Sequence, residues 1–142
     1  MTTSTMTTVR LGMTDLEVSP IAFGTWQLGG EWGRFDEDEG IAAIRQAREL
    51  GVNLFDTAQG YGFGASERLL GRALRADLDN RRDEVVIATK GGLRMTDDGL
   101  VRDSSPDWLR SGVDNSERSA WITSTSTRCT GPTRTSPSPR PR

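Results

Sequence analysis

The stretch V-N-L-F-D-T-A-Q-G-Y-G, from Val52 to Gly62, gives the clearest indication of the fold of this chain. It begins with a short, mainly apolar run that ends at Asp56, which is typical of a buried strand. A helix is expected just before it, over 36–50, because four acidic residues crowd its start, where the helix dipole favours them, and Gly51 is suited to end it. Apolar strands that alternate with amphipathic helices favour a parallel sheet with helices outside it.

The same alternation continues on both sides of this stretch. Near the N-terminus, residues 9–11 and 16–18 alternate around a glycine-containing turn, which predicts a β-hairpin. Ser105-Pro106-Asp107 has the residue types of a helix start: an N-cap, a proline at the first helical position and an acid. Further strands are therefore expected at 21–23, 52–55 and 85–88, with further helices at 65–78 and from Pro106 to Ser119.

Composition bounds the class of protein. The 142 residues suffice for one ordinary domain, and they contain no apolar run of the roughly 18 residues that a membrane span needs. The N-terminus lacks the apolar segment of a secretory signal. A single cysteine excludes an internal disulfide framework and favours a reducing compartment, so a cytoplasmic location is expected. With no histidine, the composition also argues against a zinc site.

The chain divides by composition into three parts. Residues 1–8 are a threonine-rich leader that is expected to fray. Residues 9–119 specify the fold, whereas 120–142 consist mainly of Thr, Ser, Pro and Arg and are expected to form a disordered tail. Four arginines make the tail only a weak basic patch, and the pI of the chain is near 5.2, so nucleic-acid binding is not predicted.

Catalytic or ligand-binding residues are expected where the parallel strands end, because side chains just past the carboxyl ends of such strands face the ligand site. Asp56, Tyr61 and Lys90 lie at such ends, and the last two are the only tyrosine and the only lysine of the chain. A phenol holds its proton up to a pH of about 10, and a nearby ammonium group favours the phenolate. Each residue alone more often has a structural role, but together the three make a tuned general acid. A lysine at this place could instead form a Schiff base, against which the neighbouring Asp56 and Tyr61 argue.

Several motifs in register resemble the aldo-keto reductases. N-L-F-D-T-A-Q-G-Y-G at 53–62 looks like the signature of that family. A-F-G-T-W at 22–26, S-E-R-L-L-G-R-A-L at 66–74 and V-V-I-A-T-K-G-G at 85–92 agree with it in order and spacing. The N-terminal hairpin and the stretch 104–116 also match, so the resemblance covers roughly Val9 to Ser116.

The resemblance implies about three of the eight βα units of a (β/α)8 barrel, preceded by a hairpin. It implies hydride transfer from NADPH, or from NADH in some members, to a small aldehyde or ketone. Tyr61 would be the proton donor, Lys90 would activate it, and Asp56 would pair with Lys90 and contact the cofactor. Gly24, Thr25 and Trp26 would line the cofactor or substrate pocket. Some members of the family are cofactor-sensing subunits of ion channels, so a non-catalytic, regulatory fragment is the alternative.

The sequence departs from the family pattern near Ser116. The family continues into a fourth strand with a V-H-W-P-like motif, whose histidine is the fourth catalytic residue. Some DNA sequences that encode residues 127–133 also encode Gln-Val-His-Trp-Pro-Asp in a neighbouring reading frame, and this peptide contains the missing motif. A single-base change between about Asn115 and Ala120 is therefore expected to have shifted the frame. The chain as written is expected to be marginally stable or to aggregate, and to lack useful reductase activity.

Overall fold

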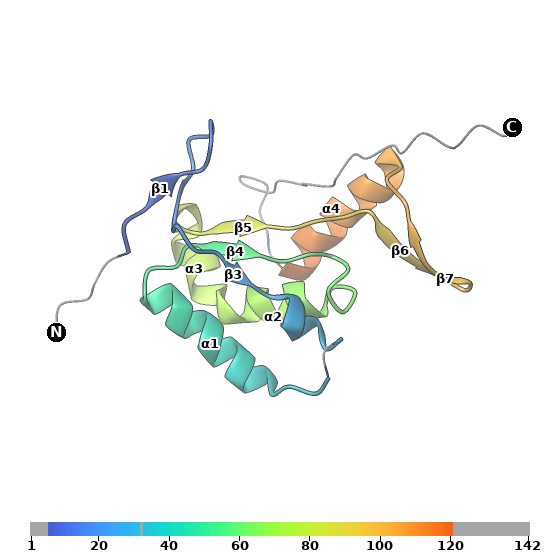
Figure 1. Ribbon diagram of the computed structural model, residues 1–142, viewed down its shortest axis with the longest axis horizontal. Coiled ribbons are helices and arrows are strands. Elements are labelled where there is room, and N and C mark those ends of the chain that lie inside the picture. The colour runs from blue at the N-terminus through green and yellow to red at the C-terminus, as the bar shows by residue number, and fades with distance from the viewer. Residues whose placement is uncertain (1–5, 32, 121–142) are drawn as a thin grey trace, which may run out of the picture.

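A three-stranded parallel sheet lies at the centre of the molecule. The computed structural model describes residues 6–31 and 33–120, and its sheet has the order β3 (Phe23–Gly24), β4 (Leu54–Asp56) and β5 (Val86–Ala88) (Figure 1). Phe23 lies opposite Phe55, and Phe55 lies opposite Ile87. Since opposed residues point to the same face of a sheet, these three side chains form one apolar layer.

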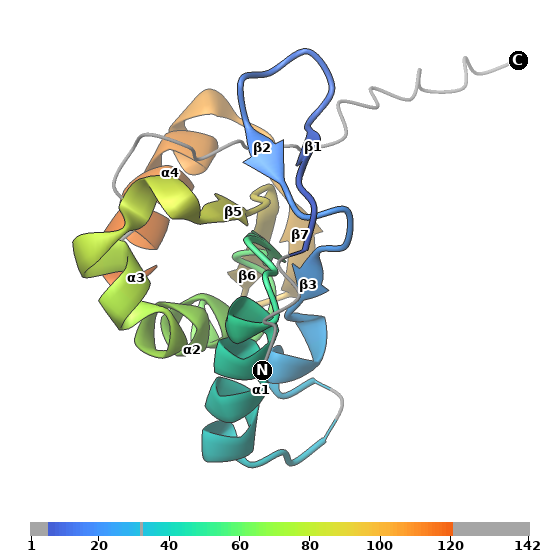
Figure 2. The same cartoon turned by 90° about the vertical axis from the view of Figure 1, so that its left-hand side faces the viewer.

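Three helices cover that layer: α1 (Glu37–Glu49), α2 (Ala65–Ala73) and α3 (Arg75–Asn80). Viewed along the strands, they form an arc on one side of the sheet (Figure 2). Helix α1 begins where the Asp36 carboxylate accepts hydrogen bonds from the next turn of backbone, and its Ile44 is completely buried. The core between sheet and helices contains Leu28, Ile41, Ile44, Val52, Phe55, Leu69, Leu70, Ala73, Leu74, Leu78, Val85 and Ile87.

The predicted N-terminal hairpin is present as β1 (Val9–Arg10) and β2 (Glu17–Val18), which pair antiparallel. It lies at the end of the sheet where the parallel strands begin (Figure 1). Met6 lies within the expected leader, but it packs against the core. Residues 1–5 of the expected leader lie outside the described residues.

Two predicted elements differ from the structure. The helix expected at 65–78 is two helices, because the backbone leaves the helical conformation at Leu74. The first parallel strand comprises only Phe23 and Gly24, and Ile21, expected in a buried strand, is 67% exposed. The apolar run therefore predicted a strand close to the observed one, but the prediction of a buried strand was wrong, because Phe23 is only half-buried and Gly24 is exposed.

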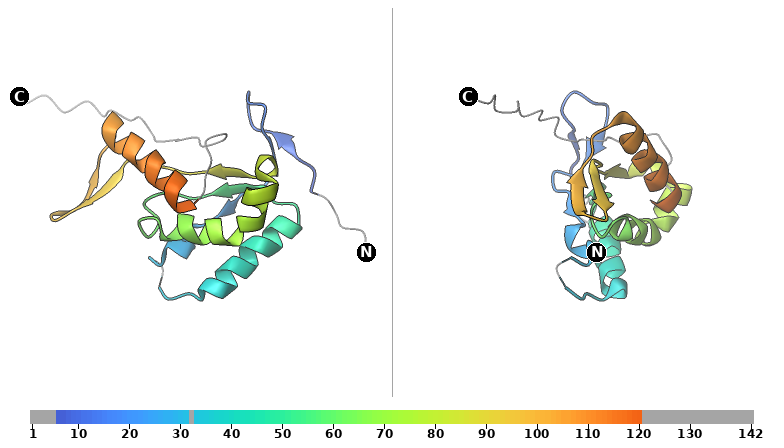
Figure 3. Two further views of the ribbon diagram at one scale, coloured as in Figure 1. Left: turned by 180° about the vertical axis from the view of Figure 1, so that it is seen from behind. Right: turned by 90° about the vertical axis from the view of Figure 1, so that its right-hand side faces the viewer.

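The connection after β5 contains a hairpin that the sequence analysis did not predict. Its strands are β6 (Leu93–Thr96) and β7 (Gly99–Arg102), and it projects beyond the carboxyl end of the sheet (Figure 1). Helix α4 (Pro106–Ala120) follows it and crosses behind the sheet region, as the view from behind shows (Figure 3). The third predicted helix is thus confirmed. The tail from residue 121 lies outside the described residues.

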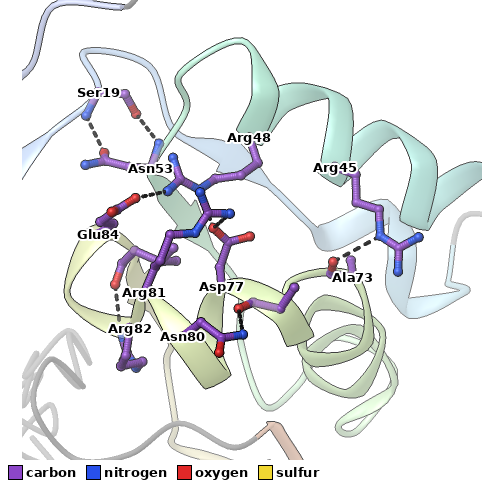
Figure 4. Close-up of polar contacts among 12 residues, drawn as sticks. Ser19, Arg45, Arg48, Asn53, Ala73, Asp77, Asn80, Arg81, Arg82 and Glu84 are labelled. Atoms are coloured by element: carbon purple, nitrogen blue, oxygen red, sulfur yellow. Dashed lines mark hydrogen bonds and ion pairs between the residues drawn. The ribbon is translucent and has the colours of Figure 1, made fainter.

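At the opposite end, ion pairs tie α1 to the segment that leads into β5 (Figure 4). Arg48 of α1 contacts the Asp77 carboxylate at 3.1 Å and the Glu84 carboxylate at 2.8 Å. Arg81 adds a second cation to Asp77 at 3.0 Å. Because Asp77 is largely buried, both guanidinium groups compensate a charge that would otherwise be costly to remove from water. These contacts stabilise the fold away from the carboxyl ends of the parallel strands.

None of the described helices is long and apolar enough to cross a membrane.

Candidate active site

The carboxyl ends of β4 and β5 bring Asp56 and Lys90 into direct contact. The Lys90 ammonium group donates to the Asp56 carboxylate and, at 2.9 Å, to the carbonyl oxygen of Thr57. The side chains of Lys90 and Asp56 are 34% and 41% exposed, so the pair is held in place yet remains open to a ligand. Two acceptors on one strand end thus fix the position of the single lysine.

Tyr61 completes this cluster from the loop that follows β4. The Lys90 nitrogen lies 5.2 Å from the centroid of the Tyr61 ring. The Trp26 ring stacks on the Tyr61 ring with 6.0 Å between centroids and 20° between planes. Trp26 begins η1 (Trp26–Gly29), the turn that follows β3. Four of the residues expected at the site therefore gather from the ends of all three parallel strands.

Backbone geometry explains how the Tyr61 loop comes so close to η1. Gly62 has a φ of +59°, and a Cβ atom there would lie 2.1 Å from the Gly29 carbonyl oxygen. A Cβ atom on Gly29 would lie 2.7 Å from the Gly62 nitrogen. Only glycine at both positions lets the two backbones touch.

Thr25 is placed differently from its predicted role. It is completely buried, and its hydroxyl group donates to the Asp56 carbonyl oxygen at 3.2 Å. The Ser66 hydroxyl group lies 2.7 Å from that of Thr25 and 3.2 Å from that of Thr57. Thr25 therefore supports the backbone beneath Asp56 rather than lining an open pocket. Sequence analysis did not single out Ser66, because a serine in the first turn of a helix has ordinary local reasons to be there.

A buried carboxylate provides a second support that the sequence analysis missed. Glu67 of α2 is 3% exposed, and it accepts hydrogen bonds from the hydroxyl groups of Thr89, at 2.7 Å, and Ser116, at 2.9 Å. The side-chain amide of Gln59 in turn donates to the Ser116 oxygen at 3.2 Å. These contacts connect α4 to the residue before Lys90 and to the Tyr61 loop. The available signal was that Glu67 lies one turn before Leu70, on the apolar face of α2.

Gly24 leaves room for a flat ligand beside this cluster. It lies opposite Asp56 in the sheet, it is exposed, and no atom lies within 4 Å of where its Cβ atom would be. A ring could thus approach the backbone of β3 next to the Asp56–Lys90 pair. The residues present therefore fit the reacting end of a nicotinamide cofactor.

A hairpin and three parallel strands with helices outside them form the arrangement expected for part of a (β/α)8 barrel, with polar side chains at the carboxyl ends of the strands. Comparison with known proteins agrees. The sequence model of the Aldo/keto reductase family matches residues 20–120, and the chain belongs to that family.

Individual relatives are similar over the same region. Aldo-keto reductase YhdN of Bacillus subtilis is 40% identical over 104 residues, which are 72% of this chain and 31% of that protein. The holo form of the aldo-keto reductase AKR11C1 from Bacillus halodurans aligns with a TM-score of 0.70 and 32% identity, over 82% of this chain and 37% of that one. An aldo-keto reductase from Klebsiella pneumoniae in complex with NADPH aligns with a TM-score of 0.62 and 27% identity, over 82% and 36%. The chain thus spans about a third of the length of these relatives.

Proposed function

We propose that this chain carries the proton-donor part of a carbonyl reductase site. In the proposed reaction a small aldehyde or ketone gains a hydride at its carbon and the phenolic proton of Tyr61 at its oxygen, which gives an alcohol. The observation that carries the proposal is the position of the Lys90 ammonium group, 5.2 Å from the Tyr61 ring and bonded to Asp56. A positive charge there stabilises the phenolate that remains after the proton has left.

A reduced nicotinamide, NADPH or alternatively NADH, supplies the hydride when it is bound. Gly24 and Asp56 would border its reacting ring, Trp26 would lie beside the substrate, and Thr25 would support the strand end from below. The similarity to a reductase in complex with NADPH supports this choice. We also propose a cytoplasmic location, because a chain with one cysteine has no internal disulfide that would need an oxidising compartment.

The 142-residue chain by itself is proposed to be inactive. It contains no histidine for the fourth catalytic position that the family resemblance implies. Its described sheet has three parallel strands, whereas ligand sites on (β/α)8 barrels draw on loops from the whole ring. Reading the DNA for residues 104–142 in all three frames tests whether a shifted frame explains this. A neighbouring frame that continues as V-H-W-P supports the shift, and the absence of such a frame overturns it.

The lysine–tyrosine contact can be tested without turnover. Tyr61 is the only tyrosine, so labelling tyrosine with ¹³C at the ζ carbon gives one signal from the folded chain. Lys90→Met is expected to move this signal because it removes the adjacent charge. The matched control is Arg10→Met, which removes an exposed cation of the N-terminal hairpin and should leave the signal in place. An unchanged signal in Lys90→Met contradicts the proposed role of Lys90.

Incubation of the purified chain with cofactor and carbonyl compounds separates the alternatives. NADPH binding without NADPH oxidation supports the proposed cofactor site, and it is also the result expected if the chain is a non-catalytic, regulatory fragment. Turnover by the 142-residue chain overturns the proposed inactivity. A borohydride-trapped adduct on the single lysine indicates Schiff-base chemistry and overturns the reductase assignment.

A further inference from the structure

Glu31 lies next to the candidate site, although neither its sequence position nor the proposed reaction assigns it a role. It follows η1 by two residues, after Gly30 has turned the chain back with a φ of +87°. This left-handed turn brings the Glu31 carboxylate over the segment that begins at Trp26. A glutamate in an exposed loop ordinarily stays solvated, so its two contacts here call for an explanation.

Each carboxylate oxygen of Glu31 binds a different loop. Oε2 accepts a hydrogen bond from the Trp26 indole nitrogen at 2.9 Å. Oε1 accepts a hydrogen bond from the backbone N–H of Gly62 at 3.1 Å. Hydrogen bonds to an ionised acceptor are shorter and stronger than those between neutral groups. One side chain therefore connects the ring that stacks on Tyr61 to the residue that directly follows Tyr61.

These contacts act at the place where the two loops already touch. The indole has few ways to change position, because it stacks on Tyr61 and donates to Glu31. The Gly29–Gly62 contact sets the separation of the backbones, but it leaves the rotation of the Trp26 and Tyr61 side chains open. The carboxylate removes that freedom for the indole, and the indole face in turn limits the Tyr61 ring.

We infer that Glu31 is a positioning residue that fixes the Trp26 indole against the Tyr61 ring and thereby directs the phenol toward Lys90. The inference rests on the proposed roles of Tyr61 and Lys90, but the part that is measured, the position of the indole against the Tyr61 ring, depends neither on Lys90 nor on cofactor binding. Glu31 itself touches neither reacting group, so it acts through Trp26 and through the backbone of Gly62.

The test uses the full 142-residue chain and its single tyrosine. Ring protons that lie over an indole face resonate upfield. The Tyr61 ring protons, observed through ¹³C labels at the ε carbons, are therefore expected upfield of their position in the urea-unfolded chain. Glu31→Ala should lose most of this displacement. Trp26→Leu gives the value without stacking. The matched control is Glu37→Ala, which removes an exposed carboxylate paired with Arg72 and should leave the displacement unchanged.

Two further measurements separate positioning from general destabilisation. The urea midpoint of Glu31→Ala should remain close to that of the starting chain, because its two hydrogen bonds are exposed. Glu31→Gln retains one acceptor oxygen and should keep an intermediate upfield displacement of the Tyr61 ring. If the alanine variant does not fold, the glutamine variant tests the inference in its place. A wild-type displacement retained in both variants overturns the inference, as does an undisplaced Tyr61 ring in the starting chain. Failure of the Lys90→Met experiment would contradict the proposed function but would leave this result unaffected.

Discussion

Replacing Gly62 with alanine is expected to force apart the two loops that meet at the candidate site. The residue has a φ of +59°, and a new Cβ atom would lie 2.1 Å from the Gly29 carbonyl oxygen. The left-handed conformation costs an L-residue about 1–2 kcal/mol. Contacts of real Cβ atoms are essentially never under 3.0 Å, so the loops must separate by at least 3.0 − 2.1 = 0.9 Å. Overpacking of this kind adds about 1–3 kcal/mol, which makes the total about 2–5 kcal/mol.

Two control variants separate strain from collision. Gly12→Ala has nearly the same φ, +57°, but no atom lies within 4 Å of the new Cβ atom. Gly64→Ala lies in the same loop as Gly62, and the nearest atom is the mobile end of the Arg68 side chain. Each control should cost only about the 1–2 kcal/mol of the left-handed conformation. The effect of alanine on the unfolded chain is common to all three variants and cancels.

The assay is urea unfolding followed by circular dichroism, together with the signal of labelled Tyr61. Gly62→Ala should lower the free energy of unfolding by clearly more than either control. It should also shift the Tyr61 signal, whereas Gly12→Ala should not. If Gly62→Ala is no more destabilising than Gly64→Ala, the two loops do not touch as described and the argument from their contact is wrong.

Three further predictions concern the core, a helix cap and acid stability. Ile44→Ala should cost about 2–5 kcal/mol by urea unfolding, because the side chain is completely buried, whereas exposed Ile21→Ala should change stability by less than about 0.5 kcal/mol. Asp36→Ala should cost about 1 kcal/mol by the same measurement, because α1 loses its N-cap, and Asp36→Ser should recover most of the loss. Hydrogen bonds from Ser105 hold the pKa of the Asp103 carboxyl below its usual value, so its contribution is present near neutral pH and is lost as the pH falls through the folded-state value. Amide signals at the start of α4 should therefore weaken as the pH falls below the ordinary range of aspartate carboxyl groups, and Asp103→Asn should lack that transition.

Much of the fold could be predicted from local pattern. The order of strands and helices followed from apolar periodicity, and Asp36, with the acids after it, marked the start of α1 to within a residue. The hairpin β6–β7 was missed although its turn, Asp97-Asp98, and the Gly99 that follows it are residues that favour tight turns. Its strands are largely exposed. They therefore lack the apolar runs from which buried strands are recognised.

The break between α2 and α3 could not be predicted in the same way. The apolar spacing continues through Leu74 to Leu78, and both side chains belong to the core. One continuous helix and two successive helices would show the same spacing of apolar residues, so the spacing does not distinguish them. After the break, Asp77 of α3 pairs with Arg48 of α1 and with Arg81, and the first of these contacts joins residues that are distant in the chain.

Local sequence patterns were enough to identify the chemical groups at the strand ends, because an apolar strand followed by Asp56, Tyr61 or Lys90 can be recognised from neighbouring residues. The way in which these groups are supported depends on the three-dimensional fold. Thr25 and Glu67 are buried beneath the site, and Glu31 bridges two loops. Such contacts join residues that are distant in the chain, so no local spacing encodes them. They arise only when parallel strands bring their carboxyl ends to one edge and close packing leaves each buried polar group to find its partner there.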